Sequence, residues 1–278
     1  MTIVPASSIA RQFWCEMQVD LRRKYGDVRT PEMKRGSEIH ESLLLEISEV
    51  IPVRVETPAD KLHVIVHNII VGTEQYKRKG ITRELPVLFK FDHVFILGFI
   101  DEIAKTGRGG IYLTQVVETK TRMTKRHPSP SQVYCDKMQG MIYWYGLSSM
   151  ISRGISIEEV CSAFEIDPNR ISISEEYAMS LGIPSAFLEG TFIMDIKTAL
   201  KEIAKLPKLS NKIKLKYIYQ GTGEEIYREE YEFNHKLFDQ KMKWALDYWL
   251  GRRDAVPVRK NRWKCKFCSY KNVCPAVR

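Results

Sequence analysis

The chain lacks the long apolar run that a membrane protein needs. None of its 278 residues belongs to a stretch approaching the ~20 apolar residues of a membrane span. The first residues, MTIVPASSIARQF, also lack the apolar core of a secretory signal. Internal repeats, low-complexity segments and a glycine-rich phosphate loop are missing too, which argues against repeat arrays and P-loop enzymes. We therefore expect a protein without membrane contacts and with an intracellular, cytoplasmic location.

Acidic residues are fewer than basic residues. The sequence has 34 Asp and Glu against 43 Lys and Arg, which gives a formal net charge of +9 and a pI near 9.1. This balance favours an acidic polymer as a partner, and nucleic acid is the leading candidate. The hydrophobic share is ordinary at 44%, and the length allows one large domain or two modest ones with ample core.

Cysteine is scarce as well, with six residues of two kinds. Cys135 and Cys161 are isolated, and we interpret them as small buried residues. The others near the end of the chain form a C-x2-C-x5-C group, made of Cys265, Cys268 and Cys274. Three clustered thiolates need a fourth ligand to complete a zinc site or an iron–sulfur cluster, and Cys15 is the best available. Such a site would join the two chain ends, and its spacing alone does not separate zinc from iron–sulfur.

The main candidate for a reactive site is a predicted β-hairpin over residues 98–122, which reads GFIDEIAKTGRGGIYLTQVVETKTR. Runs of β-branched and aromatic residues flank a glycine pair in this stretch. If Gly109 and Gly110 form a two-residue turn, Asp101 falls directly opposite Glu118. Glu118 and Lys120 are two residues apart in a strand, so they share a face. The hairpin therefore predicts two carboxylates and one ammonium in a single patch.

Such a patch suits hydrolysis of a phosphodiester. Carboxylates hold Mg²⁺ or Mn²⁺, the metal lowers the pKa of a bound water, and a lysine can position that water. An Asp followed by Glu-x-Lys on a strand is the nuclease signature PD-(D/E)xK. A solvated hairpin face is the alternative interpretation, but Glu118 directly follows the apolar Val116 and Val117, as in a buried strand.

Other candidates lie on predicted helices. Thr30 and Pro31 start a helix with an apolar face, on which His40 is either a core residue or a metal ligand. The members of that face are Met33, Gly36, Ile39, His40, Leu43, Leu44 and Ile47. A second amphipathic helix is expected over residues 59–76. Gln139 and Tyr143 are neighbours on one face of a third, over residues 131–150.

The rest of the chain gives weaker signals. Arg122, Lys125 and Arg126 follow the hairpin and either track a phosphate backbone or face solvent; beside a candidate active site we favour the contact. Residues 151–209 predict only short helices and loops. Residues 212–233 alternate like a hairpin, with tyrosines that are either core or platforms for bases. A final helix is expected over residues 235–250.

Motifs along the chain can be set in order. They are Cys15-Glu16, Gly36 and His40, Arg83-Glu84-Leu85-Pro86-Val87, Gly98-x-x-Asp101-Glu102, Glu118-Thr119-Lys120-Thr121-Arg122, Gln139-x3-Tyr143, Trp249-x-Gly251-x-Arg253 and C-x2-C-x5-C. This series resembles the exonuclease V family, the iron–sulfur single-strand DNA exonucleases of the wider RecB-type nuclease group. The resemblance touches almost the whole chain except residues 151–209.

The resemblance implies an α/β fold with a RecB-like PD-(D/E)xK nuclease core, in which helices flank a mixed sheet, and a helical covering. A single domain would fill residues 1–278. Its core would span about 30–150, a helical and hairpin region about 151–250, and a cluster-binding tail about 251–278 together with Cys15.

The resemblance also implies roles for single residues. A [4Fe–4S] cluster would be held by Cys15, Cys265, Cys268 and Cys274. His40, Asp101 and Glu118 would ligate Mg²⁺ or Mn²⁺, and Lys120 would assist the water. Gln139 and Tyr143 would orient substrate or catalytic groups, and the role of Glu84 stays open. Contacts with nucleic acid are expected from Arg83, Arg122, Lys125 and Arg126.

The expected function is therefore metal-dependent hydrolysis of single-stranded DNA from a strand end, in DNA repair or replication, with a single-strand-binding protein as a possible partner. One alternative is the CRISPR-adaptation nucleases, a sister family with the same four cysteines. That family usually has Cys-Pro where this chain has Cys15-Glu16. Another alternative is a non-enzymatic DNA-binding protein with a structural zinc. The sequence leaves the end polarity, the product length and the oligomeric state open.

Overall fold

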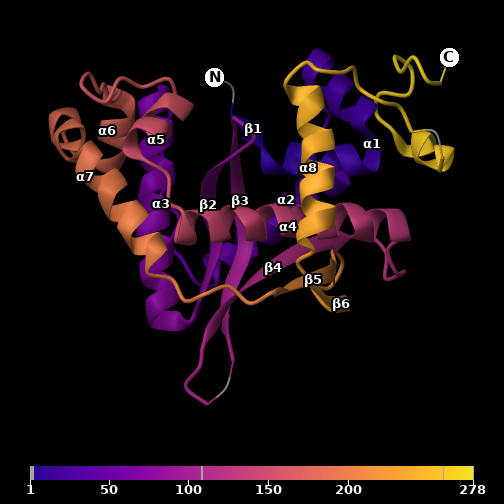
Figure 1. Ribbon diagram of the computed structural model, residues 1–278, viewed down its shortest axis with the longest axis horizontal. Helices are drawn as coiled ribbons and strands as arrows, with labels where there is room; N and C mark the ends of the chain where they lie inside the picture. The colour runs from indigo at the N-terminus through magenta and orange to yellow at the C-terminus, as the bar shows by residue number, and fades with distance from the viewer. Residues whose placement is uncertain (1–2, 108, 259, 278) are drawn as a thin grey trace.

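A computed structural model describes residues 3–107, 109–258 and 260–277 of the chain. Its strands are β1 (Val4–Pro5), β2 (Ile81–Phe91), β3 (Val94–Thr106), β4 (Leu113–Arg122), β5 (Lys212–Tyr219) and β6 (Glu225–Glu232). Its helices are α1 (Ala6–Tyr25), α2 (Pro31–Leu45), α3 (Pro58–Lys79), α4 (Pro130–Ser152), α5 (Ile157–Ala163), α6 (Glu175–Leu181), α7 (Ser185–Ala204) and α8 (His235–Trp249), with a short 3-10 helix at Arg262–Phe267. One mixed sheet with flanking helices results, which confirms the predicted α/β class (Figure 1).

The sheet is organised around β3. Along one edge, β3 pairs with β2 in the antiparallel sense over most of its length. Along the other edge, it pairs with β1 in parallel at residues 96–97 and with β4 in the antiparallel sense over residues 102–106. β4 then continues beside β5, in parallel, over residues 117–122, and β6 follows β5. A fork therefore opens between β3 and β4, at residue 101 of β3.

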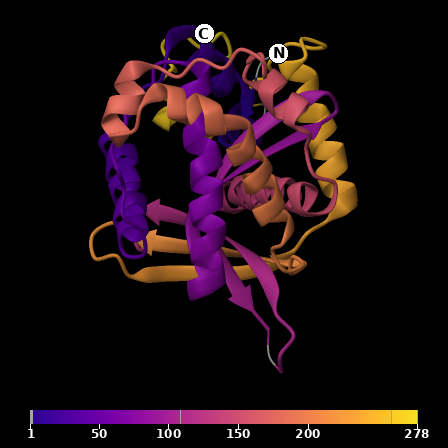
Figure 2. The same ribbon diagram turned by 90° about the vertical axis from the view of Figure 1, so that its left-hand side faces the viewer.

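The register of the β3–β4 hairpin is the predicted one. Glu102 pairs with Val117 and Thr106 with Leu113, so Asp101 is level with Glu118. The connection is longer than two residues, because the strands end at Thr106 and Leu113; residue 108 lies outside the described residues. The hairpin projects from the body of the protein (Figure 2).

Helix α3 confirms the second predicted helix and lengthens it. Thr57 and Asp60 form a reciprocal capping box at its start, and Gly80 ends it in the left-handed region with a φ of 73°. Its apolar stripe packs on β2 and α7 and belongs to one buried cluster that runs from Val4 to Leu246. In the described part of the chain, no helix is both long enough and apolar enough to cross a lipid bilayer.

The prediction for residues 151–209 was partly wrong. Two short helices and a turn at Asp167 are present as expected, but α7 is a 20-residue helix. Its buried side chains recur at intervals of three or four residues, at Leu188, Phe192, Ile196, Ala199 and Ile203. Helical periodicity was thus present in the sequence and was overlooked.

Helix α2 begins where the sequence predicts, with the Thr30 hydroxyl accepting a hydrogen bond from the Met33 backbone. Its apolar face is not packed into the core. Gly36 is its one buried residue among those described, and Met33 is 43% exposed. This face instead lines an open cleft, which places His40 at a site rather than in the core.

Helix α1 and the segment that follows α8 are tied together by an ion pair in which Glu16 is buried. Both nitrogens of the Arg253 fork donate to Glu16, at 2.6 and 2.7 Å. Glu16 also accepts hydrogen bonds from Gln12 Nε2 at 2.6 Å and from the Val256 backbone at 2.7 Å. The Glu16 side chain is only 1% exposed, so its charge depends on these partners.

We predict that Arg253→Ala lowers the free energy of unfolding by about 3–5 kcal/mol, because it leaves the buried Glu16 carboxylate without its counter-charge. Arg252→Ala is the matched control. Arg252 is 53% exposed and pairs with Asp92 and Asp247 at the surface, so its loss should cost less than about 1 kcal/mol. Denaturant unfolding of both variants gives the comparison; equal losses would contradict the structural role of the pair.

Candidate active site

The candidate site lies at the fork between β3 and β4. Asp101 Oδ2 accepts a hydrogen bond of 2.7 Å from the backbone N–H of Thr119. The backbone ladder between the two strands ends one residue earlier, at Glu102, so the Asp101 side chain supplies the next link. The strands can therefore part while one Asp101 oxygen, Oδ1, stays available to a ligand.

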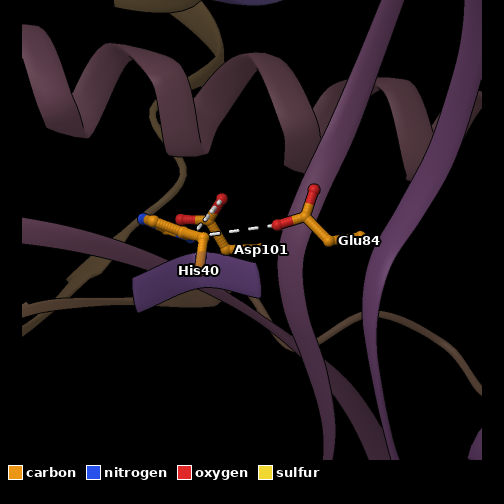
Figure 3. Close-up of side chains that lie close together, drawn as sticks. All are labelled: His40, Glu84 and Asp101. Carbon is orange, nitrogen blue, oxygen red and sulfur yellow. Dashed lines mark ion pairs between the residues drawn. The ribbon is translucent and has the colours of Figure 1, made fainter. Parts of the chain in front are cut away.

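Three side chains bring ligand atoms to one point of this fork (Figure 3). His40 of α2, Glu84 of β2 and Asp101 of β3 offer ligand atoms that lie within 4.8 Å of one another. His40 Nδ1 is 3.8 Å from Glu84 Oε1 and 3.8 Å from Asp101 Oδ1. Among the described residues, no other set of three or more such side chains is grouped as closely. The two carboxylates supply the hard oxygen ligands that Mg²⁺ and Mn²⁺ prefer, and His40 adds a nitrogen.

Glu84 belongs to this group because β2 is irregular at its position. The ladder between β2 and β3 continues on both sides of Glu84 but skips it. Its φ is 53°, in the left-handed region that residues other than glycine seldom adopt. Strain of this kind is concentrated at functional sites. Burial, and then the charge of Asp101, raise the pKa of Glu84 to about 8.

Glu118 and Lys120 lie on β4 beside this group. Glu118 is fully buried, and one of its oxygens is 2.6 Å from Lys120 Nζ. Neither Glu118 oxygen has a well-aligned hydrogen bond within the described part of the protein. Burial and the charge of Asp101 raise the pKa of Glu118 well above its usual value, although Lys120 opposes the shift. A buried carboxylate that has a raised pKa and lacks well-aligned hydrogen bonds is stabilised by an additional cation nearby.

Lys120 is held by the pair predicted on the third helix. Its ammonium donates to Gln139 Oε1 at 2.9 Å, and Gln139 Nε2 donates to the Tyr143 hydroxyl at 3.0 Å. Burial lowers the pKa of Lys120, but the charges of Glu118, Asp136 and Asp101 outweigh that effect and raise it. Lys120 is therefore a cation at neutral pH.

Sequence reasoning missed Asp136, a half-buried carboxyl on α4 whose charge acts on Lys120. Burial raises the pKa of Asp136, and the Tyr217 hydroxyl donates to it at 2.6 Å. Tyr217 is 1% exposed, so it is a core residue and not a platform for bases. The alternation of β5 indicated a buried face, but no local signal connected it to Asp136, 81 residues away.

A cleft of about 830 Å³ leads to the site, and three arginines from the first part of the chain line it. Arg22 forms an ion pair with Asp27, and Arg29 Nε lies 3.8 Å from the same carboxylate. Arg11 is half-buried and has no hydrogen-bond or ion-pair partner among the described residues. Burial and the charge of Arg22 lower the pKa of Arg11. An unpaired guanidinium beside candidate metal ligands is suited to a phosphate.

The basic residues predicted to bind nucleic acid are arranged differently. Arg83 is committed within the protein, since it donates to the Leu43 carbonyl, to Glu46 and to Glu102. Lys125 is 58% exposed and lies 2.6 Å from Glu224. Arg126 is exposed, and the Arg122 Nε is buried without a hydrogen bond. The arginines of the cleft were overlooked because no helix was predicted over residues 6–25.

The four cysteines singled out by spacing lie around a second, small pocket. Cys15 comes from α1, and its φ and ψ of −163° and 109° interrupt the helix there. The other three, Cys265, Cys268 and Cys274, come from the C-terminal segment and line the same pocket. Gln18 Nε2 lies 3.7 Å from Cys268 Sγ. The four cysteines therefore lie around one pocket, and the metal site predicted for them stays a prediction.

Comparison with known proteins agrees with these features. A family model described as "Exonuclease V - a 5' deoxyribonuclease" matches residues 4–109 and 185–275. The chain belongs to the exonuclease V family. Exonuclease V of Danio rerio is 27% identical to it over 278 residues, which cover 95% of this chain and 67% of the relative. The family predicted from the motifs is thus confirmed, and with it a deoxyribonuclease, that is, a hydrolase.

The exonuclease V match has a gap that bears on the site. The matched segments contain His40, Glu84, Asp101 and the four clustered cysteines. Residues 110–184 lie outside the match, and this gap holds Glu118, Lys120, Gln139 and Tyr143. The roles assigned to the residues in the gap depend on the geometry of β4 and α4.

We predict that Glu84→Gln raises the thermal midpoint in EDTA, by an amount that grows as the pH rises from about 4.5 to 8. The pKa of Glu84 is raised to about 8 in the folded state. Between its unfolded and folded pKa values, ionisation therefore favours the unfolded protein, and this cost is absent for Gln. If Glu84 is a ligand, saturating Mg²⁺ at pH 8 should reverse the order, because a carboxylate binds the cation more tightly than a neutral amide does. Equal stabilisation of both proteins by Mg²⁺ would remove Glu84 from the metal group.

Proposed function

We propose that this member of the exonuclease V family is a metal-dependent exonuclease that hydrolyses single-stranded DNA from its 5' end, in DNA repair or replication. The observation that carries the proposal is the arrangement at the fork. His40, Glu84 and Asp101 share one point, and Glu118 and Lys120 lie next to it. The order of the strands, with Glu118 and Lys120 on β4 level with Asp101 on β3, supports assignment to the RecB-like PD-(D/E)xK nucleases.

The residues of the fork fit a divalent cation. Glu84 and Glu118 have raised pKa values and the oxygens of Glu118 lack hydrogen bonds, so a cation would relieve a destabilising excess of carboxyl groups. His40, Glu84 and Asp101 would hold Mg²⁺ or Mn²⁺, with Glu118 as the remaining candidate ligand. Such an ion neutralises phosphate charge and lowers the pKa of a bound water. Lys120, fixed by Gln139, presents a positive charge where negative charge develops.

The cleft supports a nucleic-acid strand as substrate. Arg11 offers an unpaired guanidinium on its wall, and Arg22 and Arg29 offer further positive charge. A flexible single strand can follow such a concave path, whereas a stiff duplex cannot bend into it. The matched family is described as a 5' deoxyribonuclease, which supports cleavage from the 5' end.

We predict that the wild-type protein, with Mg²⁺, degrades linear single-stranded DNA and leaves covalently closed single-stranded circles intact. Asp101→Ala and Glu118→Ala should each reduce cleavage more than about 100-fold, since a lost ligand removes several kcal/mol of transition-state stabilisation. Lys120→Ala should also be severely impaired. The assay follows oligonucleotides blocked at either end in turn.

Binding by the same variants provides the control. Affinity for phosphates comes mainly from cationic side chains, so Asp101→Ala should keep its affinity for single-stranded DNA, whereas Arg11→Ala should weaken it. Undiminished cleavage by both carboxylate variants would contradict the active-site assignment. Rapid cutting of circles would show an endonuclease.

The cysteine pocket supports an iron–sulfur cluster as a second cofactor. Cys15, Cys265, Cys268 and Cys274 line one pocket and would supply the four thiolates that a cubane cluster needs. A single zinc would take the same four ligands, and membership of the exonuclease V family favours the cluster. The cluster would add a covalent link between the chain ends.

We predict that Cys15→Ser releases iron from anaerobically purified protein and lowers its thermal midpoint, because cluster binding contributes directly to folding free energy. Cys135→Ser and Cys161→Ser are the controls. Cys135 Sγ donates to the Ala10 carbonyl and Cys161 is buried in the main core, so neither variant should lose iron. Iron per chain and the visible absorption spectrum are the measurements. Full iron content in Cys15→Ser would show that the other three find their fourth ligand elsewhere.

A further inference from the structure

A second cavity adjoins the metal-ligand group from another side. It measures about 380 Å³ and lies between the irregular segment 46–57, α3 and α6. Leu44, Val50 and Glu84 line both this cavity and the arginine-lined cleft. Glu84 therefore lies where the arginine-lined cleft meets the smaller cavity.

The walls of the smaller cavity do not suit a phosphate. Aliphatic side chains such as Ile51, Val64 and Ile183 share these walls with uncharged polar side chains such as Ser48 and Asn68 and with His63 and His67. The charged groups on its walls are the carboxylates of Glu49 and Glu84 and the guanidinium of Arg83, which is already committed within the protein. A neutral, flat and largely apolar group fits these walls, and the volume falls within the range of small-molecule pockets.

Two buried polar atoms beside this cavity have no partner among the described residues. Gln75 Nε2 donates to the Ile47 carbonyl at 2.6 Å and to Ser48 Oγ at 2.7 Å, but Gln75 Oε1 accepts nothing. Thr82 Oγ1 is likewise unpaired, on a residue that is 1% exposed. Unsatisfied buried polar groups are rare and costly, so this side of the cavity is less tightly packed in hydrogen-bonding terms than the rest of the core.

The segment 46–57 can adjust to an occupant. It is fixed at one end by Gln75 and at the other by Asp60, whose Oδ2 accepts from the backbone of residues 56 and 57. Between these anchors, residues 49–55 take part in no hydrogen bond with the described chain. Val50 and Ile51 are 49% and 64% exposed, so this wall has apolar surface that a bound ligand could cover.

We propose that this cavity receives the base of the terminal nucleotide, on the 5' side of the bond that is cut. The inference rests on the proposed exonuclease function and identifies where the substrate end is bound. The retained strand then follows the cleft lined by Arg11, Arg22 and Arg29, and its last phosphate passes the group around Glu84. A base combines flat apolar faces with donors and acceptors on its edge, which match the apolar walls and the polar side chains of Ser48, His67 and Asn68 among them.

The test uses single-stranded oligonucleotides in which one nucleotide near the 5' end is replaced by an abasic one. Removal of the seated base should lower kcat/KM about tenfold, in line with stacking contributions of about 1–3 kcal/mol per base. Asn68→Phe places a ring on an exposed wall position of the cavity and should cut the intact and the abasic oligonucleotides at the same low rate. Glu74→Phe, exposed elsewhere on α3, should keep the wild-type preference.

A binding measurement separates this inference from catalysis. With Asp101→Ala and 2-aminopurine at the first 5' position, bound DNA should be protected from acrylamide quenching, and the added Asn68→Phe change should remove the protection. If the wild type leaves intact oligonucleotides uncut, the proposed function fails and the inference with it. Normal cleavage that ignores abasic positions, or equal quenching in both proteins, would overturn the inference alone.

Discussion

One hydrogen bond, from the Thr119 backbone to Asp101 Oδ2, sets the geometry on which the site depends. It keeps β3 and β4 in register at the point where their backbones separate. Without it, two acidic residues level with each other would drive the strands further apart by charge repulsion. With it, Asp101 stays where the two strands separate, beside the buried Glu118, so the carboxyl groups of these two residues lie close together.

Convergence of carboxyl groups has a cost that the rest of the site offsets. Glu84 and Glu118 both have raised pKa values, and Glu84 also adopts an unfavourable φ. Lys120 compensates part of this charge, and Gln139 holds it in place. A divalent cation at the fork, as we propose, would relieve this excess of acidic groups, whereas a hydrated surface carboxylate has no such cost to relieve.

Sequence reasoning found the features that depend on local spacing. The hairpin register, the helix with Gln139 and Tyr143, and the clustered cysteines all follow from distances of a few residues along the chain. It did not find Asp136, Arg11 or the exposure of the α2 face, because these depend on which element packs where. An apolar face on a helix predicts burial, but a ligand cleft presents the same pattern when the covering partner is the substrate.

The joining of the chain ends illustrates the same limit. Spacing suggested a metal staple between Cys15 and the C-terminal cysteines, and it gave no sign of other contacts between the chain ends. The structure adds the buried pair of Glu16 and Arg253 next to it, with Trp249 donating to Gln12 at 2.8 Å. These contacts need no metal, so they hold the chain ends together independently of a cluster. The loop is then closed by the ion pair as well as by the proposed cluster, and we expect loss of the cluster to lower stability without unfolding the nuclease fork.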